Sequence, residues 1–304
     1  MPAADAYASW IGRSEIRGDT ITPTPWRALA ATLDLASPAA AAGDALPPLA
    51  HWLYALPLHP ASEIGSDGHA RRGAFLPPVA LPRRMWAGGR FRFEQPLRIG
   101  DAATRTSTIE SINAKSGRSG ELVFVTVRHD WRRTEAGPIA LTEWHDIVYR
   151  DALPVEEIAP ATSATPAQPN AGVSASIAKT LTANPLPKAD WSREIVADPV
   201  LLFRYSALTF NAHRIHYDLA YATLAEGYPG LVVHGPLLAT LLLGLLQRQL
   251  PDAELSNFEF RAKRPLFATR PFHIHGASPG GQTTRLWAND FDGELAMEAS
   301  ATLR

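Results

Sequence analysis

Side chains that hold and move protons are concentrated in one short stretch of the chain. The stretch reads Tyr-Ser-Ala-Leu-Thr-Phe-Asn-Ala-His-Arg-Ile-His-Tyr-Asp. Within eight residues it supplies an amide, two imidazoles, a guanidinium and a carboxylate, from Asn211, His213, His216, Arg214 and Asp218. Such a density of proton-transfer groups is unusual outside a functional site. We therefore interpret this stretch as the centre of a candidate active site that performs acid–base chemistry.

Two other interpretations of the histidines are weaker. His213 and His216 have the i, i+3 spacing of paired metal ligands, but the stretch contains no clear third ligand, so no metal site is expected. They could also be ordinary surface histidines beside a turn. Because Asn211 and Asp218 surround them, a site is the favoured interpretation.

A second segment, Gly-Leu-Val-Val-His-Gly-Pro, ends in His234, Gly235 and Pro236 and leads into an apolar run. Proline is favoured at the first position of a helix, so a helix is predicted to begin here. Backbone N–H groups at a helix N-terminus stabilise negative charge, such as that formed on a thioester oxygen when the adjacent carbon gains or loses a proton. Gly235 lets such an oxygen approach; its simpler role is to permit a tight entry into the helix.

The run that follows, Pro-Leu-Leu-Ala-Thr-Leu-Leu-Leu-Gly-Leu-Leu-Gln, is apolar on all sides of a helical wheel. A helix of this kind is buried on every side, and the run is too short to span a membrane. Strand-like segments are predicted at Glu121–Val127, Thr142–Tyr149, Pro271–Gly276, Thr284–Ala288 and Glu294–Thr302. One apolar helix among many strands indicates an α+β hotdog arrangement, in which an antiparallel sheet wraps around a helix.

The two halves of the chain resemble each other. Phe91-Arg-Phe93 followed by Pro-Leu is echoed by Phe258-Glu-Phe260 followed by Pro-Leu. A Pro-, Ala-, Ser- and Thr-rich stretch separates the halves. We predict a double hotdog with two antiparallel sheets, each wrapped around a helix. Its parts are a degenerate N-terminal domain at 1–151, a connection at 152–195 and a catalytic domain at 196–304. In the first half, the helix-like stretch from Trp26 to Ala36 is the predicted counterpart of the apolar helix.

Bulk properties narrow the classes of function. The chain has 304 residues, a formal net charge of −1 and no cysteine. Nucleic acid is not expected as a partner, because duplex binding depends on excess Lys and Arg. The absence of cysteine excludes thiolate nucleophiles, disulfides and zinc–sulfur sites. The first ten residues lack the pattern of a secretory leader, so a cytoplasmic location is expected and no membrane association.

Together, the two segments resemble the R-specific enoyl-CoA hydratases of the MaoC-like family. The resemblance places the family's catalytic histidine on His216 and its oxyanion-hole glycine on Gly235. The family's asparagine falls on His213 and its catalytic aspartate on Asn211, and these two positions depart from the pattern. The chain more closely resembles mesaconyl-CoA or itaconyl-CoA hydratases and mitochondrial-type 3-hydroxyacyl-thioester dehydratases. The residues that carry this resemblance are Thr-Phe-Asn-Ala-His-Arg-Ile-His-Tyr-Asp and, from Pro82, Pro-Arg-Arg-Met-Trp-Ala-Gly-Gly.

The resemblance implies a hydro-lyase that adds water to the double bond beside a coenzyme A thioester. No cofactor is expected, because coenzyme A is part of the substrate. Asn211 cannot accept a proton, so it is expected to position water or an imidazole, and His216 is expected to be the single acid/base.

The remaining candidates are expected to contact the substrate. Guanidinium groups form bidentate hydrogen bonds with carboxylates, so Arg83, Arg84 and Arg214 are candidates for binding a carboxylate on the acyl group. The basic cluster of Arg261, Lys263 and Arg264 is a candidate for the coenzyme A phosphates, although solvated strand-edge charges are the commoner explanation. His213 and His234 complete the set of substrate-binding candidates.

Three alternatives stay open. The chain could be a 3-hydroxyacyl-thioester dehydratase of fatty acid synthesis, which runs the same chemistry towards water loss. It could be an acyl-CoA thioesterase, although Asn211 replaces the obvious carboxylate base. It could also be an acyl-CoA binder without catalysis. A homodimer is expected as one possible assembly.

Overall fold

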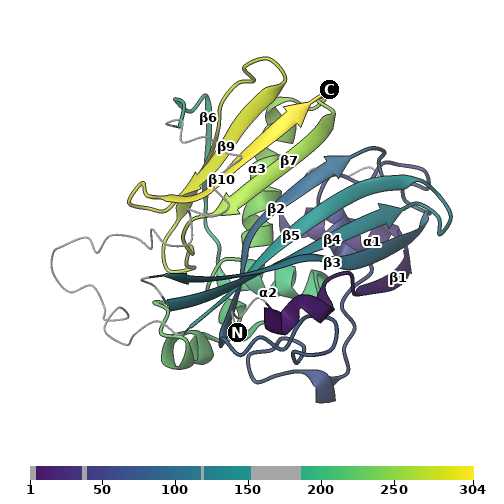
Figure 1. The fold of residues 1–304 in the computed structure, drawn as a ribbon. Coiled ribbons are helices and arrows are strands. Elements are labelled where there is room, and N and C mark those ends of the chain that lie inside the picture. Colours follow the sequence, from purple (N-terminus) through teal and green to yellow (C-terminus); the bar gives the residue numbers. More distant parts are fainter. Residues whose placement is uncertain (1–4, 36–39, 118–119, 152–185) are drawn as a thin grey trace.

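The computed structural model describes residues 5–35, 40–117, 120–151 and 186–304 (Figure 1). Most of the predicted connection, residues 152–185, lies outside the described residues. The last five residues of the connection predicted at 152–195, Trp191–Ile195, form a strand that pairs with Phe272–Gly276. The second half therefore begins earlier than the sequence indicated, because this edge strand completes its sheet.

The described strands form one antiparallel sheet in the order β1-β3-β4-β5-β2-β7-β10-β9-β8-β6. In the first half they are β1 (Ser14–Thr20), β2 (Arg83–Phe93), β3 (Ala102–Gly117), β4 (Gly120–Arg132) and β5 (Ile139–Arg150). In the second half they are β6 (Trp191–Ile195), β7 (Leu255–Ala262), β8 (Phe272–Gly276), β9 (Thr283–Asn289) and β10 (Leu295–Leu303). All five strands predicted from the sequence are present, with ends shifted by a few residues.

The strand order is the same when read from either edge, with β1 matching β6 and β2 matching β7. The echoed phenylalanines lie at the centre of this symmetry, where Phe91 pairs with Phe258 and Gly89 with Phe260. The expectation of two separate sheets was wrong, because β2 and β7 hydrogen-bond to each other and join the halves into one sheet. This pairing satisfies the inner edge of each half, which would otherwise expose unpaired backbone groups.

In the described part of the chain, three α-helices and several short helical turns pack against the sheet. The α-helices are α1 (Pro23–Thr32), α2 (Pro199–Leu208) and α3 (Gly235–Gln249). The short turns are η1 (Asp5–Trp10), η2 (Ala50–Leu53), η3 (Ala61–Glu63), η5 (Arg214–His216) and the π-helical η6 (Tyr221–Ala225). Within the described part of the chain, no helix is long and apolar enough to cross a bilayer.

The apolar run forms α3, which packs against β8, β9, β10 and β6 of the second half. Its leucines from Leu237 to Leu246 are buried in the main core. The helix is not apolar throughout, because Arg248 and Gln249 at its C-terminal end are exposed. Hydrophobic burial on several sides therefore fixes the position of the first turn of α3, which carries Gly235.

Among the described residues of the first half, no helix corresponds to α3. The predicted counterpart forms α1, which has ten residues, begins with a proline in its first turn and follows edge strand β1, as α2 follows edge strand β6. The segment before η2 matches the segment before α3, because each makes an equivalent backbone hydrogen bond. Leu46 donates its N–H to the Leu97 carbonyl, and Val233 donates its N–H to the Leu266 carbonyl. The expectation that the stretch from Trp26 is the counterpart of the apolar helix was wrong, since this stretch forms α1, which corresponds to α2, and the short turn η2 lies where α3 lies in the second half.

Candidate active site between the two halves

The histidine-rich segment of the second half is held by a loop of the first half. Arg214 donates its backbone N–H to the Asp67 carbonyl at 2.9 Å and its guanidinium to the Ser66 carbonyl at 3.0 Å. Gly68 adopts a φ of +89°, and a Cβ there would lie 1.7 Å from the Ala212 carbonyl oxygen. Only glycine permits so close an approach, so the loop and the segment form one unit.

His216 is buried, and its orientation is fixed by the segment that leads into α3. Its Nδ1 lies 2.7 Å from the Val232 carbonyl oxygen, and the Val232 N–H donates to the Ile215 carbonyl at 2.9 Å. Because a carbonyl only accepts, the proton resides on Nδ1 and Nε2 carries a lone pair. Burial lowers the pKa of His216 to about 4, so the imidazole is neutral at pH 7.

His234 connects His216 to the start of α3. The two rings stack with centroids 3.7 Å apart, and Nε2 of His234 lies 2.8 Å from the Ser206 hydroxyl. Gly235 follows directly and is the first residue of α3. The structure thus brings the imidazole at 216 and the helix N-terminus at 235 together.

Gly235 combines two properties of an oxyanion site. The first N–H groups of a helix have no partner within the helix. A Cβ added at Gly235 would meet no atom within 4 Å, so there is open space beside the backbone. An oxygen with negative charge could therefore approach this helix end.

Asn211 and His213 form the turn before η5. The Asn211 side-chain oxygen accepts the backbone N–H of His213 at 3.1 Å. One lone pair of the Asn211 oxygen therefore shapes the turn, which leaves its amide nitrogen and its second lone pair for the expected role in holding water or an imidazole. The His213 ring lies 5.5 Å from the His216 ring, edge to face. Burial lowers the pKa of His213, and the charges of His69 and His216 lower it further.

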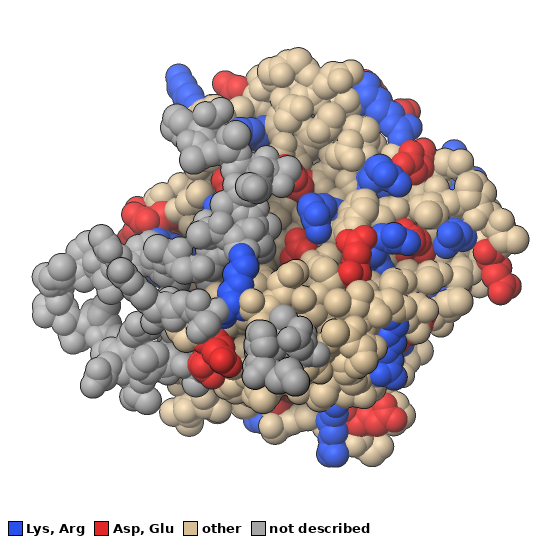
Figure 2. Space-filling view, in the orientation of Figure 1, with Lys and Arg blue, Asp and Glu red and all other residues tan. Residues whose placement is uncertain are grey.

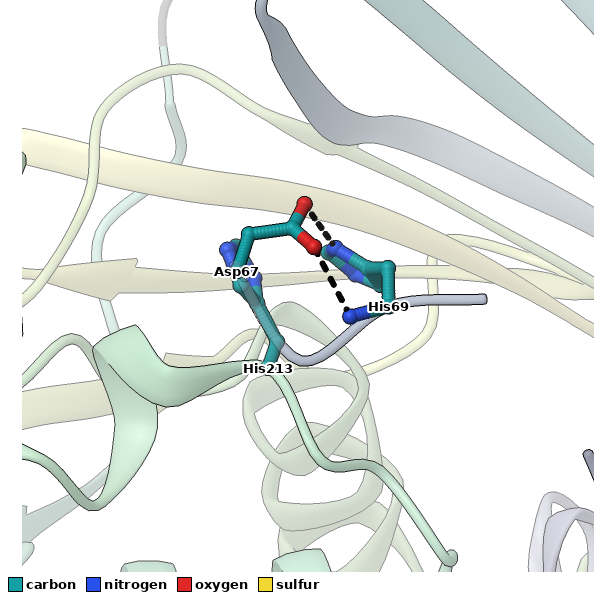
Figure 3. A group of neighbouring side chains, drawn as sticks. All are labelled: Asp67, His69 and His213. Carbon is teal, nitrogen blue, oxygen red and sulfur yellow. Dashed lines mark hydrogen bonds and ion pairs between the residues drawn. The ribbon is translucent and has the colours of Figure 1, made fainter. Parts of the chain in front are cut away.

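Asp67 and His69, which the sequence analysis did not select, complete the cluster (Figure 3). The Oδ2 atom of Asp67 lies 3.0 Å from Nδ1 of His69, and the rings of His69 and His213 lie 4.0 Å apart. The ligand-type atoms of Asp67, His69 and His213 all lie within 4.8 Å of one another, so this set could accommodate a metal ion. No sequence pattern pointed to these two residues, because Asp-Gly-His lies in an aperiodic loop far from residue 213.

The three candidate arginines differ in their partners. Arg83 contacts Glu226, with Nε 3.4 Å from Oε2 and Nη2 donating to its carbonyl at 2.8 Å. Arg214 binds Asp218 through two hydrogen bonds of 3.0 and 2.7 Å. Arg84 forms no ion pair with a carboxylate in the described part of the chain.

Arg84 also lies close enough to the cluster to act on its histidines electrostatically. Its positive charge lowers the pKa of His69 and of His213. Arg84 therefore places a positive charge near the histidines.

The basic cluster of the second half is largely neutralised. Lys263 lies 2.6 Å from Glu298, and Arg264 contacts Asp290 and Glu294 at 3.4 and 3.1 Å. Arg261 is buried on β7. Their assignment to coenzyme A phosphates stays a prediction, and these ion pairs would have to open or be shared for it to hold.

Sequence comparisons give the chain its family. Residues 49–268 match the family described as hydroxyacyl-thioester dehydratase type 2. The chain is 46% identical over 305 residues to a mesaconyl-C(4)-CoA hydratase of Chloroflexus aurantiacus, covering 100% of this chain and 99% of the relative. It is 31% identical over 262 residues to a mitochondrial hydroxyacyl-thioester dehydratase type 2 of Schizosaccharomyces pombe, covering 82% of each.

Solved structures share the fold at low identity. HtdX of Mycobacterium tuberculosis gives a TM-score of 0.63 with 17% identity, covering 95% of this chain and 99% of that one. Another Mycobacterium tuberculosis protein, described as a double hotdog, gives a TM-score of 0.55 with 14% identity and covers 97% of this chain and 96% of its own. The fold is therefore a double hotdog, and the chain belongs to the hydroxyacyl-thioester dehydratase type 2 family of MaoC-like hydro-lyases.

Proposed function

We propose that the chain reversibly adds water to the α,β double bond of an acyl-CoA thioester. The strongest support for this proposal is one observation at the site. A buried, neutral imidazole with a free Nε2, His216, stacks on His234 immediately before the open N-terminus of α3. This places a proton acceptor and a site for negative charge beside each other, as hydration of an enoyl thioester requires.

The chemistry follows from these two groups. In hydration, Nε2 of His216 takes a proton from water while the water oxygen bonds to the β carbon. The electron pair of the double bond moves towards the thioester carbonyl, whose oxygen gains negative charge. The N–H of Gly235 is the group that stabilises this charge, and His216 then returns the proton to the α carbon.

The acyl group that the site favours is a short dicarboxylyl chain, such as that of mesaconyl-CoA or itaconyl-CoA. The Chloroflexus relative, named a mesaconyl-C(4)-CoA hydratase, supports this choice through identity over the full chain. Arg84 supports it physically, because it forms no ion pair with a carboxylate in the described residues and its charge reaches His69 and His213. A guanidinium in that position suits a second carboxylate on the acyl group.

A second candidate function is the dehydration of 3-hydroxyacyl thioesters, which is the reverse reaction on a substrate with a different acyl group. The 31% identity to the Schizosaccharomyces pombe dehydratase favours it. Comparing kcat/KM for mesaconyl-CoA, itaconyl-CoA and crotonyl-CoA with that for straight-chain 3-hydroxyacyl-CoA separates the two. A clear preference for the straight-chain substrates would reject the dicarboxylyl assignment.

The test of the function is the loss of enoyl-thioester absorbance on mixing with purified protein, for wild type and His216→Ala. We expect turnover by His216→Ala to fall by about 10²-fold or more with an unchanged unfolding midpoint, because a general acid–base group contributes about that much. Near wild-type turnover would remove His216 from the mechanism. Release of free thiol would indicate a thioesterase instead, and binding without turnover a non-catalytic protein.

Three further expectations remain proposals. The reaction requires no cofactor, because all its proton transfers are assigned to side chains. The chain forms a homodimer, which light scattering on the purified protein would test. Its location is the cytoplasm, which imaging of a tagged protein would test.

A further inference from the structure

Two histidines of the cluster are locked in the same tautomer from opposite halves of the chain. His216 donates its Nδ1–H to the Val232 carbonyl at 2.7 Å, and His69 donates its Nδ1–H to the Asp67 carboxylate at 3.0 Å. Each ring therefore keeps a lone pair on Nε2.

The two rings belong to one site. The His213 ring contacts both, with centroid distances of 4.0 Å to His69 and 5.5 Å to His216. The charge that His69 would carry lowers the pKa of His216, so the two imidazoles are electrostatic neighbours. Two rings with an acceptor nitrogen thus flank His213, although only one of them comes from the segment that resembles the family motif.

We propose that His69 is a second catalytic histidine, whose Nε2 accepts one O–H of the attacking water while Nε2 of His216 takes the proton of the other O–H. Asp67 is a positioning residue that keeps the proton of His69 on Nδ1. The proposal rests on the hydration activity proposed above.

The reaction balances with this division of roles. The water oxygen bonds to the β carbon, one water proton passes to His216 and then to the α carbon, and the other stays on the product hydroxyl. His69 neither gains nor loses a proton. Two acceptors direct both O–H bonds away from the substrate, so a lone pair of the water oxygen faces the double bond.

This arrangement also accounts for the substitution at position 211. The side-chain oxygen of Asn211 accepts the backbone N–H of His213, so it shapes the turn. The ionised carboxylate beside the imidazoles is instead that of Asp67, whose pKa is held well below its usual range by its hydrogen bonds to His69. The carboxylate that position 211 lacks therefore comes from the first half.

The test is Asp67→Asn. In the wild type, Oδ1 accepts the backbone N–H of His69 at 3.0 Å and Oδ2 accepts Nδ1–H at 3.0 Å. In the variant, the amide oxygen would keep the backbone N–H, which turns the amide nitrogen towards Nδ1. His69 would then carry its proton on Nε2 and could no longer accept from water.

We expect kcat of Asp67→Asn to fall at least tenfold while KM changes less than twofold, and the ¹⁵N spectrum of His69 to show the reversed tautomer. The matched control is Glu63→Gln, which removes a carboxylate 3.5 Å from His59 in the same loop and should leave kcat unchanged. His69→Gln, which restores an acceptor near Nε2, should retain more activity than His69→Ala.

Two results would overturn the proposal. One is an unchanged kcat in Asp67→Asn with the tautomer of His69 reversed. The other is loss of wild-type activity on chelation and its recovery with Zn²⁺, which would make Asp67, His69 and His213 a metal site. In either case His216→Ala would still be inactive, whereas a wild-type protein that hydrates no enoyl-CoA would reject the function itself.

Discussion

At the scale of residues, the site consists of neutral, oriented imidazoles. His216, His69 and His234 each have one ring nitrogen fixed by a carbonyl, a carboxylate or a hydroxyl. Burial keeps them uncharged, which suits groups that accept hydrogen bonds or protons at neutral pH. The surrounding charge comes from Asp67 on one side and Arg84 on the other.

The role proposed for Arg84 predicts a substrate-selective effect. In Arg84→Met, we expect KM for mesaconyl-CoA to rise about tenfold or more, since a charge-assisted hydrogen bond contributes about 1.5–3 kcal/mol. KM for crotonyl-CoA, which lacks the second carboxylate, should stay within about twofold of wild type by the same argument. Steady-state kinetics on both substrates measures this.

A control on the same strand is Arg92→Met, which removes an exposed arginine paired with Glu94 at 2.6 Å. It should alter neither KM. Equal increases in KM for mesaconyl-CoA and crotonyl-CoA in Arg84→Met would show that Arg84 does not bind the acyl carboxylate.

At the scale of elements, the loop around Gly68 and the segment around Ala212 determine the geometry of the cluster. The loop carries Asp67 and His69, and the segment leads directly to His213 and η5. The backbone bond from Arg214 to Asp67 and the close contact at Gly68 set their spacing. The site therefore depends on a contact between halves that are distant in sequence.

This contact predicts that Gly68→Ala displaces the loop. The positive φ and the clash with the Ala212 carbonyl should lower the free energy of unfolding by about 1–3 kcal/mol and reduce kcat. Chemical denaturation and steady-state kinetics measure the two effects. The matched control is Gly100→Ala, which has a φ of +99° but no atom within 4 Å of the added Cβ. If both variants kept full kcat, the loop contact would not position the site.

At the scale of the whole molecule, the two halves of the sheet match, but different elements pack against each half. The second half packs α3 on its sheet, whereas the first half fills the corresponding region with η2 and a buried contact of His51 with Glu143 at 3.1 Å. Charges of both signs are interspersed on the visible face in Figure 2, in keeping with the net charge of −1. Recognition is therefore expected to be local to the site and not driven by a global field.

Several buried or half-buried histidines in both halves predict a loss of stability in acid. Burial lowers the pKa of His69, His145 and His216 to about 4 and that of His129 to about 3. An unfolded histidine binds a proton below about pH 6.5, whereas these folded ones stay neutral until about pH 4. The free energy of unfolding should thus be highest above pH 6.5 and fall as the pH drops towards 4.

Each such histidine contributes up to about 1.4 kcal/mol per pH unit within that window. Urea unfolding at several pH values between 4 and 7 measures the slope. A stability that is constant between pH 5 and 6.5 would contradict the burial of these neutral rings.

The sequence by itself determined the elements with strong local patterns. The run of leucines after Pro236 predicted α3, and the echoed Phe-x-Phe segments, which lie in β2 and β7, indicated the matched halves. Strand-like segments predicted β4, β5, β8, β9 and β10, whereas β1, β3 and β6 were not predicted. The spacing of His213 and His216 and the turn at Gly235 indicated the site, because these residues lie close together along the chain. Local periodicity and short-range spacing carry such information without knowledge of the fold.

Only the tertiary structure decided what depends on contacts between distant segments. It joined the two predicted sheets through β2 and β7, and it placed the short turn η2, not the helix predicted from Trp26, in the position that α3 has in the second half. It brought Asp67 and His69 to His213, although more than 140 residues separate them in the sequence. A loop without periodicity gives no indication of where it will dock, since its position is set by the backbone contacts that it makes after the sheet has formed.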